Sequence, residues 1–321
     1  MNLIDVTRTF QTDDDCLAYM ETMRWPDGIR CPVCGCNRIS RIHREPGVVK
    51  KGKTAGQARK NVRTRIYQCL EPTCKVQFSA TSGTIFNDSH LPLTKWFLAL
   101  ALIVDAKKSI SAKQLQQHLG IGSYKTAWYM AHRLRKSMEN KHAEEFSGII
   151  EMDETYSGGK MRGKGVRAAK AAKQEVIGIK ERGGNVRFFH APDAKIETLA
   201  KYLKEHVSGT VEMINTDDFG AYPKALRLAG HDLAKHRTVN HSQGIYVDGL
   251  DTTNGIESAF SLFKRALIGS YHKVSIKHLH RYLSEFQNRF NGRKASDRFE
   301  PTMRRMLGVE PMPYAELIEA E

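Results

Sequence analysis

Three acidic residues stand at positions where carboxylates can converge. Asp153 comes late in the apolar run GIIEMDET, and Asp217 comes near the end of another, VEMINTDD. If both runs are neighbouring strands, the two carboxylates meet at one edge of a sheet. Glu257 lies in a helical pattern, NGIESAFSLFKR, and Lys264 follows it two turns later on the same face. This arrangement would suit a carboxylate that helps to hold a metal ion and a cation that binds a nearby phosphate.

The period of a strand divides the residues around Asp153 between two faces. Asp153 shares one face with Glu151 and Thr155, whereas Met152 and Glu154 point to the other. Taken singly, each acid is more simply explained as a solvated surface carboxylate. Two strand ends and a helix together favour a site instead. For Glu151 and Glu154, a supporting role and plain solvation both stay open.

Two short-spaced cysteine pairs predict a metal site of a different kind. They are Cys31-Pro-Val-Cys34 and Cys69-Leu-Glu-Pro-Thr-Cys74. Four thiolates in tetrahedral geometry favour one structural Zn²⁺, with no open coordination position. All six cysteines lie in the first 74 residues, which favours a local site over a disulfide framework. Unrelated buried cysteines are the simpler alternative, and Cys36 and His43 are close enough in sequence to compete as ligands.

Alternating strands and helices must position the acids from residue 148 onward. The predicted strands are GIIEMDET, EVIGIKER, NVRFFHA and TVEMINTDD, the second and third joined by a hairpin at Gly183-Gly184. The predicted helices are KIETLAKYLKEHV, a helix from about 254 to 268, and SIKHLHRYLSEFQNRF. Three strands, a helix and a further strand predict a mixed sheet with flanking helices.

The whole chain of 321 residues is long enough for two or three units. It is predicted to be a multidomain α/β protein with five segments. They are a helical lead-in (1–29), a zinc ribbon with a basic insert (30–86), a helix-turn-helix-like segment (90–140), the sheet-forming segment (147–295) and a C-terminal tail (296–321).

The helical segment contains SAKQLQQHLGIGSYKTAWYMAHRLRKSM, in which Gly120-Ile121-Gly122 separates two helices. In the second helix Ala127, Met130, Ala131 and Leu134 are expected to pack inward. Lys125, Arg133 and Arg135 are then left for DNA. The alternative is a helical hairpin that only packs against the sheet-forming segment.

The charge of the chain points to a polyanionic partner. Fifty Lys and Arg against 35 Asp and Glu leave a net charge of +15, with a pI near 9.5. Residues 35–68 hold ten basic residues and one acid, and residues 160–173 hold six and none. The second run supplies four candidate DNA-binding residues, Lys160, Arg162, Lys164 and Arg167. A basic protein without a particular ligand is the alternative.

No segment indicates export or a membrane. The longest strongly apolar run, residues 96–104, is about half the ~20 residues that span a bilayer. The N-terminus lacks the basic start and apolar stretch of a signal peptide. A cytoplasmic, nucleoid-associated protein with no membrane partner is therefore expected.

Several motifs in order resemble one family. DETYSGG, NTDDFGAY and NGIESAFSLFKR, followed by SYHKVSIKHLHRYLSEFQNRFNGR, closely resemble the DDE transposases of bacterial insertion sequences. RWPDGIRCPVCG and YQCLEPTCKVQFSATSGTIF resemble the ribbon of the branch with an N-terminal zinc ribbon. The similarity covers roughly residues 15–295. It implies a ribonuclease-H-like catalytic domain in the sheet-forming segment.

The resemblance also implies the roles of site residues. Asp153 and Asp217 would be the first two metal-binding carboxylates, Glu257 the third, and Lys264 the basic residue that follows. Asn254 stands one turn before Glu257 and is the alternative third ligand or a helper. An anionic carboxylate binds a hard cation more strongly than an amide oxygen does, which favours Glu257.

The function implied is a transposase that nicks the ends of an insertion sequence and joins the freed 3′-hydroxyls to target DNA. Two Mg²⁺ (or Mn²⁺) ions would serve this phosphoryl transfer. Its partner would be double-stranded DNA, as terminal inverted repeats and as target, bound by a homodimer or larger assembly. The alternatives are a catalytically silent DNA-binding regulator and a structure-selective DNA nuclease of the same fold.

Overall fold

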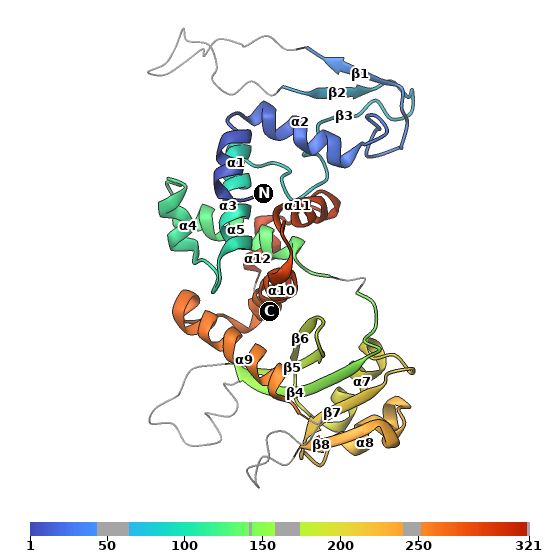
Figure 1. The fold of residues 1–321 in the computed structure, drawn as a ribbon. Coiled ribbons are helices and arrows are strands. Elements are labelled where there is room, and N and C mark those ends of the chain that lie inside the picture. The colour runs from blue at the N-terminus through green and yellow to red at the C-terminus, as the bar shows by residue number, and fades with distance from the viewer. Residues whose placement is uncertain (44–63, 141–142, 158–173, 240–251, 320–321) are drawn as a thin grey trace. The chain divides into compact units, whose positions relative to one another are not determined.

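The computed structural model describes residues 1–43, 64–140, 143–157, 174–239 and 252–319 (Figure 1). The chain divides into two compact units. The first comprises Met1–Ile103, Leu115–Ser137 and Asp297–Ala320, and the second contains Val104–Gln114 and Met138–Ser296.

The N-terminal part of the first unit consists of two helices and a small sheet. These are α1 (Leu3–Thr9), α2 (Asp13–Arg24), β1 (Ile39–Ile42), β2 (Ile66–Cys69) and β3 (Gln77–Phe78). Both helices begin at a capping box, made by Asn2 with Asp5 and by Thr12 with Asp15. The sheet is antiparallel in the order β1-β2-β3. Its apolar core is small, with Trp25, Tyr67 and Phe78 in mutual ring contact.

A buried carboxylate joins α2 to this sheet. Glu21 is 8% exposed, and its two carboxylate oxygens accept from the Tyr67 hydroxyl at 2.8 Å and from Arg65 Nη1 at 2.7 Å. Both partners come from the β2 region, so α2 and the sheet form one body.

The segment predicted to be helical contains three helices, of which the last two are separated at Gly120-Ile121-Gly122. They are α3 (Leu93–Asp105), α4 (Ala112–His118) and α5 (Tyr124–Ser137). Ala127, Met130, Ala131 and Leu134 are buried along α5, which confirms the predicted inward face. Beyond residue 296 the chain forms α11 (Phe299–Gly308) and α12 (Tyr314–Ile318).

The second unit is built on a five-stranded sheet. Its strands are β4 (Ile149–Ser157), β5 (Gln174–Glu181), β6 (Val186–Ala191), β7 (Met213–Asp217) and β8 (His236–Val239), in the order β6-β5-β4-β7-β8. β6, β5 and β4 are antiparallel, whereas β4, β7 and β8 are parallel. This mixed sheet is the ribonuclease-H-like arrangement that the sequence predicts.

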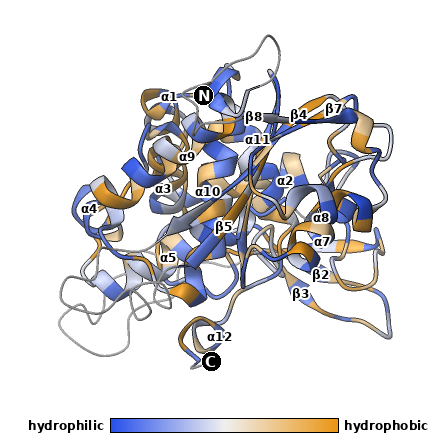
Figure 2. Ribbon diagram, turned by 90° about the horizontal axis from the view of Figure 1, so that it is seen from below, coloured by the Kyte–Doolittle hydropathy of each residue, from blue (hydrophilic) through white to orange (hydrophobic). Residues whose placement is uncertain are grey.

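Helices cover both faces of the sheet. They are α7 (Ile196–His206), α8 (Tyr222–Ala229), α9 (Asn254–Ala266) and α10 (Leu279–Asn291), with shorter turns η1 (Leu233–Lys235), η3 (Leu267–Tyr271), η4 (Ile276–His278) and η5 (Gly292–Lys294). One apolar core lies between the sheet and α7 and α8, and contains Ile150 and Met152 of β4. The other lies under α9 and α10 and contains Val176 and Phe188. Figure 2 shows apolar stretches, in orange, along the central strands.

Candidate functional site

The register of two parallel strands brings the first two acids together. Ile149, Ile150 and Glu151 of β4 pair with Met213, Ile214 and Asn215 of β7. Continued by two residues along both strands, the same register would set Asp153 beside Asp217, and the charge of Asp217 does act on Asp153. Neighbouring strands lie about 4.8 Å apart, and equivalent positions of a parallel pair point to the same face. Both side chains are partly exposed, and the amide of Phe219 donates to Asp217 Oδ1 at 3.2 Å.

The face that carries these acids is the face covered by α9. Asp153 on β4 pairs with Gly178 on the neighbouring strand β5. A Cβ added at Gly178 would lie 2.6 Å from Phe260 Cζ and 2.8 Å from Ile256 Cδ1, so α9 rests directly on the sheet there. Glu154 points to the opposite face, where its Oε2 accepts from the hydroxyl of Tyr222 at 2.6 Å. The predicted division of the strand between two faces is confirmed.

The third acid comes from the first turn of α9. Glu257 is partly exposed, and its Oε1 accepts from the hydroxyl of Thr253 at 2.8 Å. Asn254 and Lys264 are exposed on the same helix. Ile256 and Phe263 are buried and hold α9 against the sheet, so the helix must present its polar stripe along the edge of this packing.

Electrostatics links the other two acids to Asp153. Burial, followed by the negative charge of Glu154, raises the pKa of Asp153 to about 7, and the charges of Asp217 and Glu257 act in the same direction. Only the amide of Glu154, which donates to Asp153 Oδ1 at 2.8 Å, opposes them. Excess negative charge of this kind, carried by hard oxygen ligands, is what a divalent cation relieves.

The three carboxylates do not converge as closely as the ligands of an occupied metal site. Among the described residues, the set of ligating side chains that already converges for a metal ion is formed by four cysteines, not by the acids. Like charges repel at short range, which keeps carboxylates apart unless a cation lies between them. The donor types fit Mg²⁺ or Mn²⁺, and closure of the site would accompany binding.

The raised pKa predicts how stability depends on pH. The ordinary pKa of the group is 3.8, so between about pH 4 and 7 folded Asp153 keeps a proton that the unfolded chain has lost. The free energy of unfolding therefore falls as pH rises through this window and levels off above it. We expect the urea midpoint of the parent to fall more between pH 5 and 8 than that of Asp153→Asn. Equal slopes for the two proteins would contradict the prediction.

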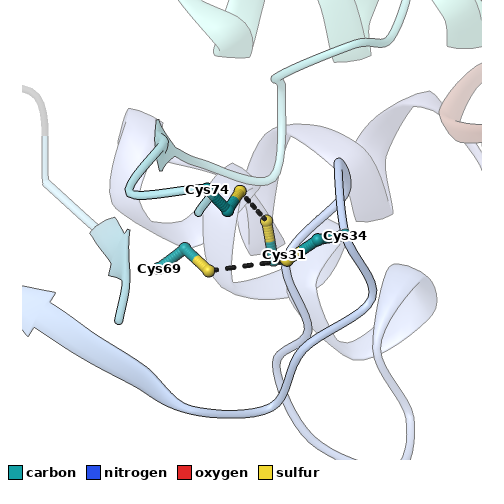
Figure 3. Close-up of side chains that lie close together, drawn as sticks. All are labelled: Cys31, Cys34, Cys69 and Cys74. Atoms are coloured by element: carbon teal, nitrogen blue, oxygen red, sulfur yellow. Dashed lines mark hydrogen bonds between the residues drawn. The ribbon is translucent and has the colours of Figure 1, made fainter. Parts of the chain in front are cut away.

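Four sulfur atoms form the metal centre of the first unit (Figure 3). The Sγ atoms of Cys31 and Cys74 lie 3.7 Å apart, those of Cys34 and Cys69 lie 3.6 Å apart, and all four lie within 4.8 Å of one another. A Zn–S bond of about 2.3 Å implies a tetrahedral edge of about 3.8 Å, so the sulfurs fit Zn²⁺.

Local amides help to prepare this centre for a cation. Burial raises the pKa of the Cys31 thiol, but the amides of Cys34 and Val33 and the neighbouring thiols outweigh it and bring that pKa to about 7. Cys36 and His43, the competing candidates, lie outside the set. Cys36 Sγ instead accepts from the amide of Arg38 at 3.3 Å.

Comparisons with known proteins find matches to both the sheet-forming segment and the cysteine-containing segment. Residues 145–291 match the model of the ISXO2-like transposase domain, and residues 11–77 match that of the transposase zinc-ribbon domain. The chain belongs to the DDE transposases of insertion sequences. The transposase is also 28% identical over 300 residues to an uncharacterised protein in transposable element ISH50 of Halobacterium salinarum, across 88% of this chain and 92% of that protein.

The structure corrects two of the predicted DNA-binding residues of the transposase. Arg133 and Arg135 are buried, at 4% and 1% exposed, and do not face solvent on α5. Arg133 Nη2 donates to the carbonyl oxygen of Asn87 at 2.7 Å, and its guanidinium lies 5.0 Å from the ring centroid of Trp96. A carbonyl and an aromatic face can stabilise an arginine in a core, which helical periodicity does not reveal.

The other predicted DNA-binding residues have different outcomes. Lys125 is exposed on α5, with its Nζ 4.3 Å from the ring centroid of Tyr314. Lys160, Arg162, Lys164 and Arg167 lie outside the described residues. Within the part of the chain that the structure describes, no helix is both long and apolar enough to cross a membrane.

Two features that position the site were missed by sequence analysis. Gly178 permits the close approach of α9, and a glycine inside the strand pattern EVIGIKER is a known signal of such an approach. Glu151 is 3% exposed and hydrogen-bonded to α9, although its sequence left plain solvation open. No local pattern signals that contact, because its partner lies 105 residues away.

Proposed function

We propose that this transposase nicks the ends of its insertion sequence and joins the freed 3′-hydroxyls to target DNA by two-metal-ion phosphoryl transfer. The observation that supports the proposal is that the charges of both Asp217 and Glu257 act on the carboxyl group of Asp153. Family membership supports the reaction class.

Each site residue has a proposed role. Asp153, Asp217 and Glu257 hold the catalytic Mg²⁺ or Mn²⁺ ions. Bound there, two such ions would activate the attacking water or 3′-hydroxyl and stabilise the leaving oxygen. Asn254, exposed at the start of α9, assists Glu257 through its amide oxygen. Lys264, exposed two turns along the helix, binds a phosphate near the site.

The remaining segments are proposed to bind and pair DNA. We assign segment 147–295 to catalysis, segments 30–86 and 90–140 to recognition of the terminal inverted repeats, and the basic stretch around Lys160 to phosphates. The segments before and after these, 1–29 and 296–321, serve as helical lead-in and tail. Because two ends must be held together, the active form is a homodimer or larger, acting on nucleoid DNA in the cytoplasm.

The decisive experiment incubates the protein with labelled terminal repeats and a supercoiled plasmid in Mg²⁺. The repeats are taken from the DNA that flanks the gene. Labelled ends covalently joined to the plasmid are expected. Cleavage without joining would identify a structure-selective nuclease instead, and binding without cleavage would identify a silent regulator.

A further inference from the structure

A buried carboxylate of β4 caps the helix that carries Glu257. Glu151 is 3% exposed, and its Oε2 accepts from the amide of Ile256 at 2.8 Å. Ile256 is the third residue of α9, within the first turn, where amides have no partner in their own helix. Thr253, the residue before the helix, makes no side-chain cap. A carboxylate at this end also interacts favourably with the helix dipole.

Two cationic side chains stand close to this carboxylate. Arg182 Nη2 lies 3.7 Å from Glu151 Oε1. Lys180, which pairs with Glu151 across β4 and β5, is 9% exposed. The contact between Glu151 and α9 is therefore a buried hydrogen bond of 2.8 Å with basic side chains beside it.

Two glycines let the helix come this close. A Cβ at Gly255 would lie 2.6 Å from Glu151 Oε2, 2.9 Å from Oε1 and 3.0 Å from Lys180 Nζ. A Cβ at Gly178, across from Asp153, would overlap Phe260 in the next turn of the helix. The helix therefore contacts the sheet closely at two points. One is the polar contact at Glu151 on β4, and the other is the apolar contact at Gly178 on β5.

We infer that Glu151 is a positioning residue, which sets the place of α9 on the sheet so that Glu257 can share a metal ion with Asp153. Glu151 lies two residues before Asp153 on the same face of β4. Its partner Ile256 is adjacent to Glu257. One hydrogen bond thus joins β4, which carries Asp153, to α9, which carries Glu257. The inference rests on the proposed function, because it takes Glu257 as a ligand.

The test compares Glu151→Ala, Glu151→Gln and Gly255→Ala in the full-length protein. Direct Mn²⁺ binding is followed by electron paramagnetic resonance, and strand transfer is followed as a function of Mn²⁺ concentration. We expect Glu151→Ala to weaken Mn²⁺ binding and strand transfer by about 10- to 100-fold, the range for residues that support metal ligands. Glu151→Gln keeps an oxygen acceptor for the amide of Ile256. It is therefore expected to lose less Mn²⁺ affinity and less strand-transfer activity than Glu151→Ala.

Gly255→Ala displaces the helix without removing a charge. Its added methyl group is expected to weaken Mn²⁺ binding by about tenfold. If Glu151→Ala does not fold, Mn²⁺ binding by Gly255→Ala tests the positioning role in its place.

Glu285→Gln is the matched control. Glu285 is fully buried in α10 of the same unit, pairs with Arg289 at 3.2 Å, and accepts from the hydroxyl of Tyr271 in η3, which follows α9 at the end remote from Glu257. Loss of the Glu285 carboxylate is expected to lower the free energy of unfolding. The Mn²⁺ dependence of strand transfer is expected to stay unchanged.

Three results would overturn the inference. They are parental Mn²⁺ binding in folded Glu151→Ala, parental binding in Gly255→Ala, and an equal change in Glu285→Gln. Failure of the proposed function has a different signature. Activity retained in Asp153→Ala would remove the function itself, whereas an inactive Asp153→Ala with a fully active Glu151→Ala would remove only the positioning role.

Discussion

Strand transfer in Mg²⁺ is expected to fall by at least about 1,000-fold when Asp153 is replaced by alanine, which corresponds to roughly 4 kcal/mol of lost transition-state stabilisation. The reason is that Asp153 is the carboxyl group on which the charges of both Asp217 and Glu257 act, so its loss would remove the proposed shared metal ligand. The measurement is the rate of joining of labelled ends to a plasmid. DNA binding by gel shift is expected to stay within a few-fold of the parent.

The adjacent pair of aspartates offers a matched comparison. Asp217 continues the register beside Asp153, whereas Asp218 is exposed one residue beyond the end of β7. Successive residues of an extended strand point in opposite directions. Asp217→Asn is therefore expected to be as inactive as Asp153→Ala, and Asp218→Asn to remain active. The reverse order, or an active Asp153→Ala, would show that the acids are wrongly placed.

Replacing Cys31 and Cys69 together by serine is expected to remove the zinc and unfold the ribbon. Structural zinc sites contribute apparent binding free energies on the order of 10 kcal/mol to small domains. The ribbon has little else, since its core is a few aromatic rings around three short strands. Metal analysis should find about one zinc per parent chain and close to none in the double variant. Limited proteolysis should then cut near residues 30–86 first.

The control for the zinc prediction lies in the same loop. Cys36 stands outside the set of four sulfurs. Cys36→Ser is therefore expected to keep its full zinc content and its resistance to proteolysis. A double variant that retained all its zinc, or a Cys36→Ser protein that lost it, would show that a different set of ligands holds the metal.

Short-range patterns were enough for the parts of the fold that depend on period and spacing. The alternation in GIIEMDET assigned Asp153 and Glu154 to opposite faces, and the structure confirms this through Gly178 on one side and Tyr222 on the other. The helical stripe of α9 was also recognisable from its period, because Ile256, Phe260 and Phe263 recur at helical spacing.

Other features did not follow from local patterns. The helix α8 and the strand β8 were not predicted, since each is short and is stabilised by the sheet that it joins. Arg133 was expected in solvent and is buried, because the carbonyl oxygen of Asn87 and the ring of Trp96, both from other segments, stabilise it. Propensity describes a segment by itself, and tertiary contacts override it.

The sequence by itself determined which residues are able to do chemistry: the four cysteines, the two strand-end aspartates and the glutamate of α9. Residue type and local period carry that information, because they depend on the covalent chain alone. The tertiary structure decided how far apart these groups lie and what supports them. The parallel register of β4 and β7, the contact of Glu151 with Ile256 and the burial of Arg133 all join segments distant in sequence. Only the packed fold brings such partners within reach.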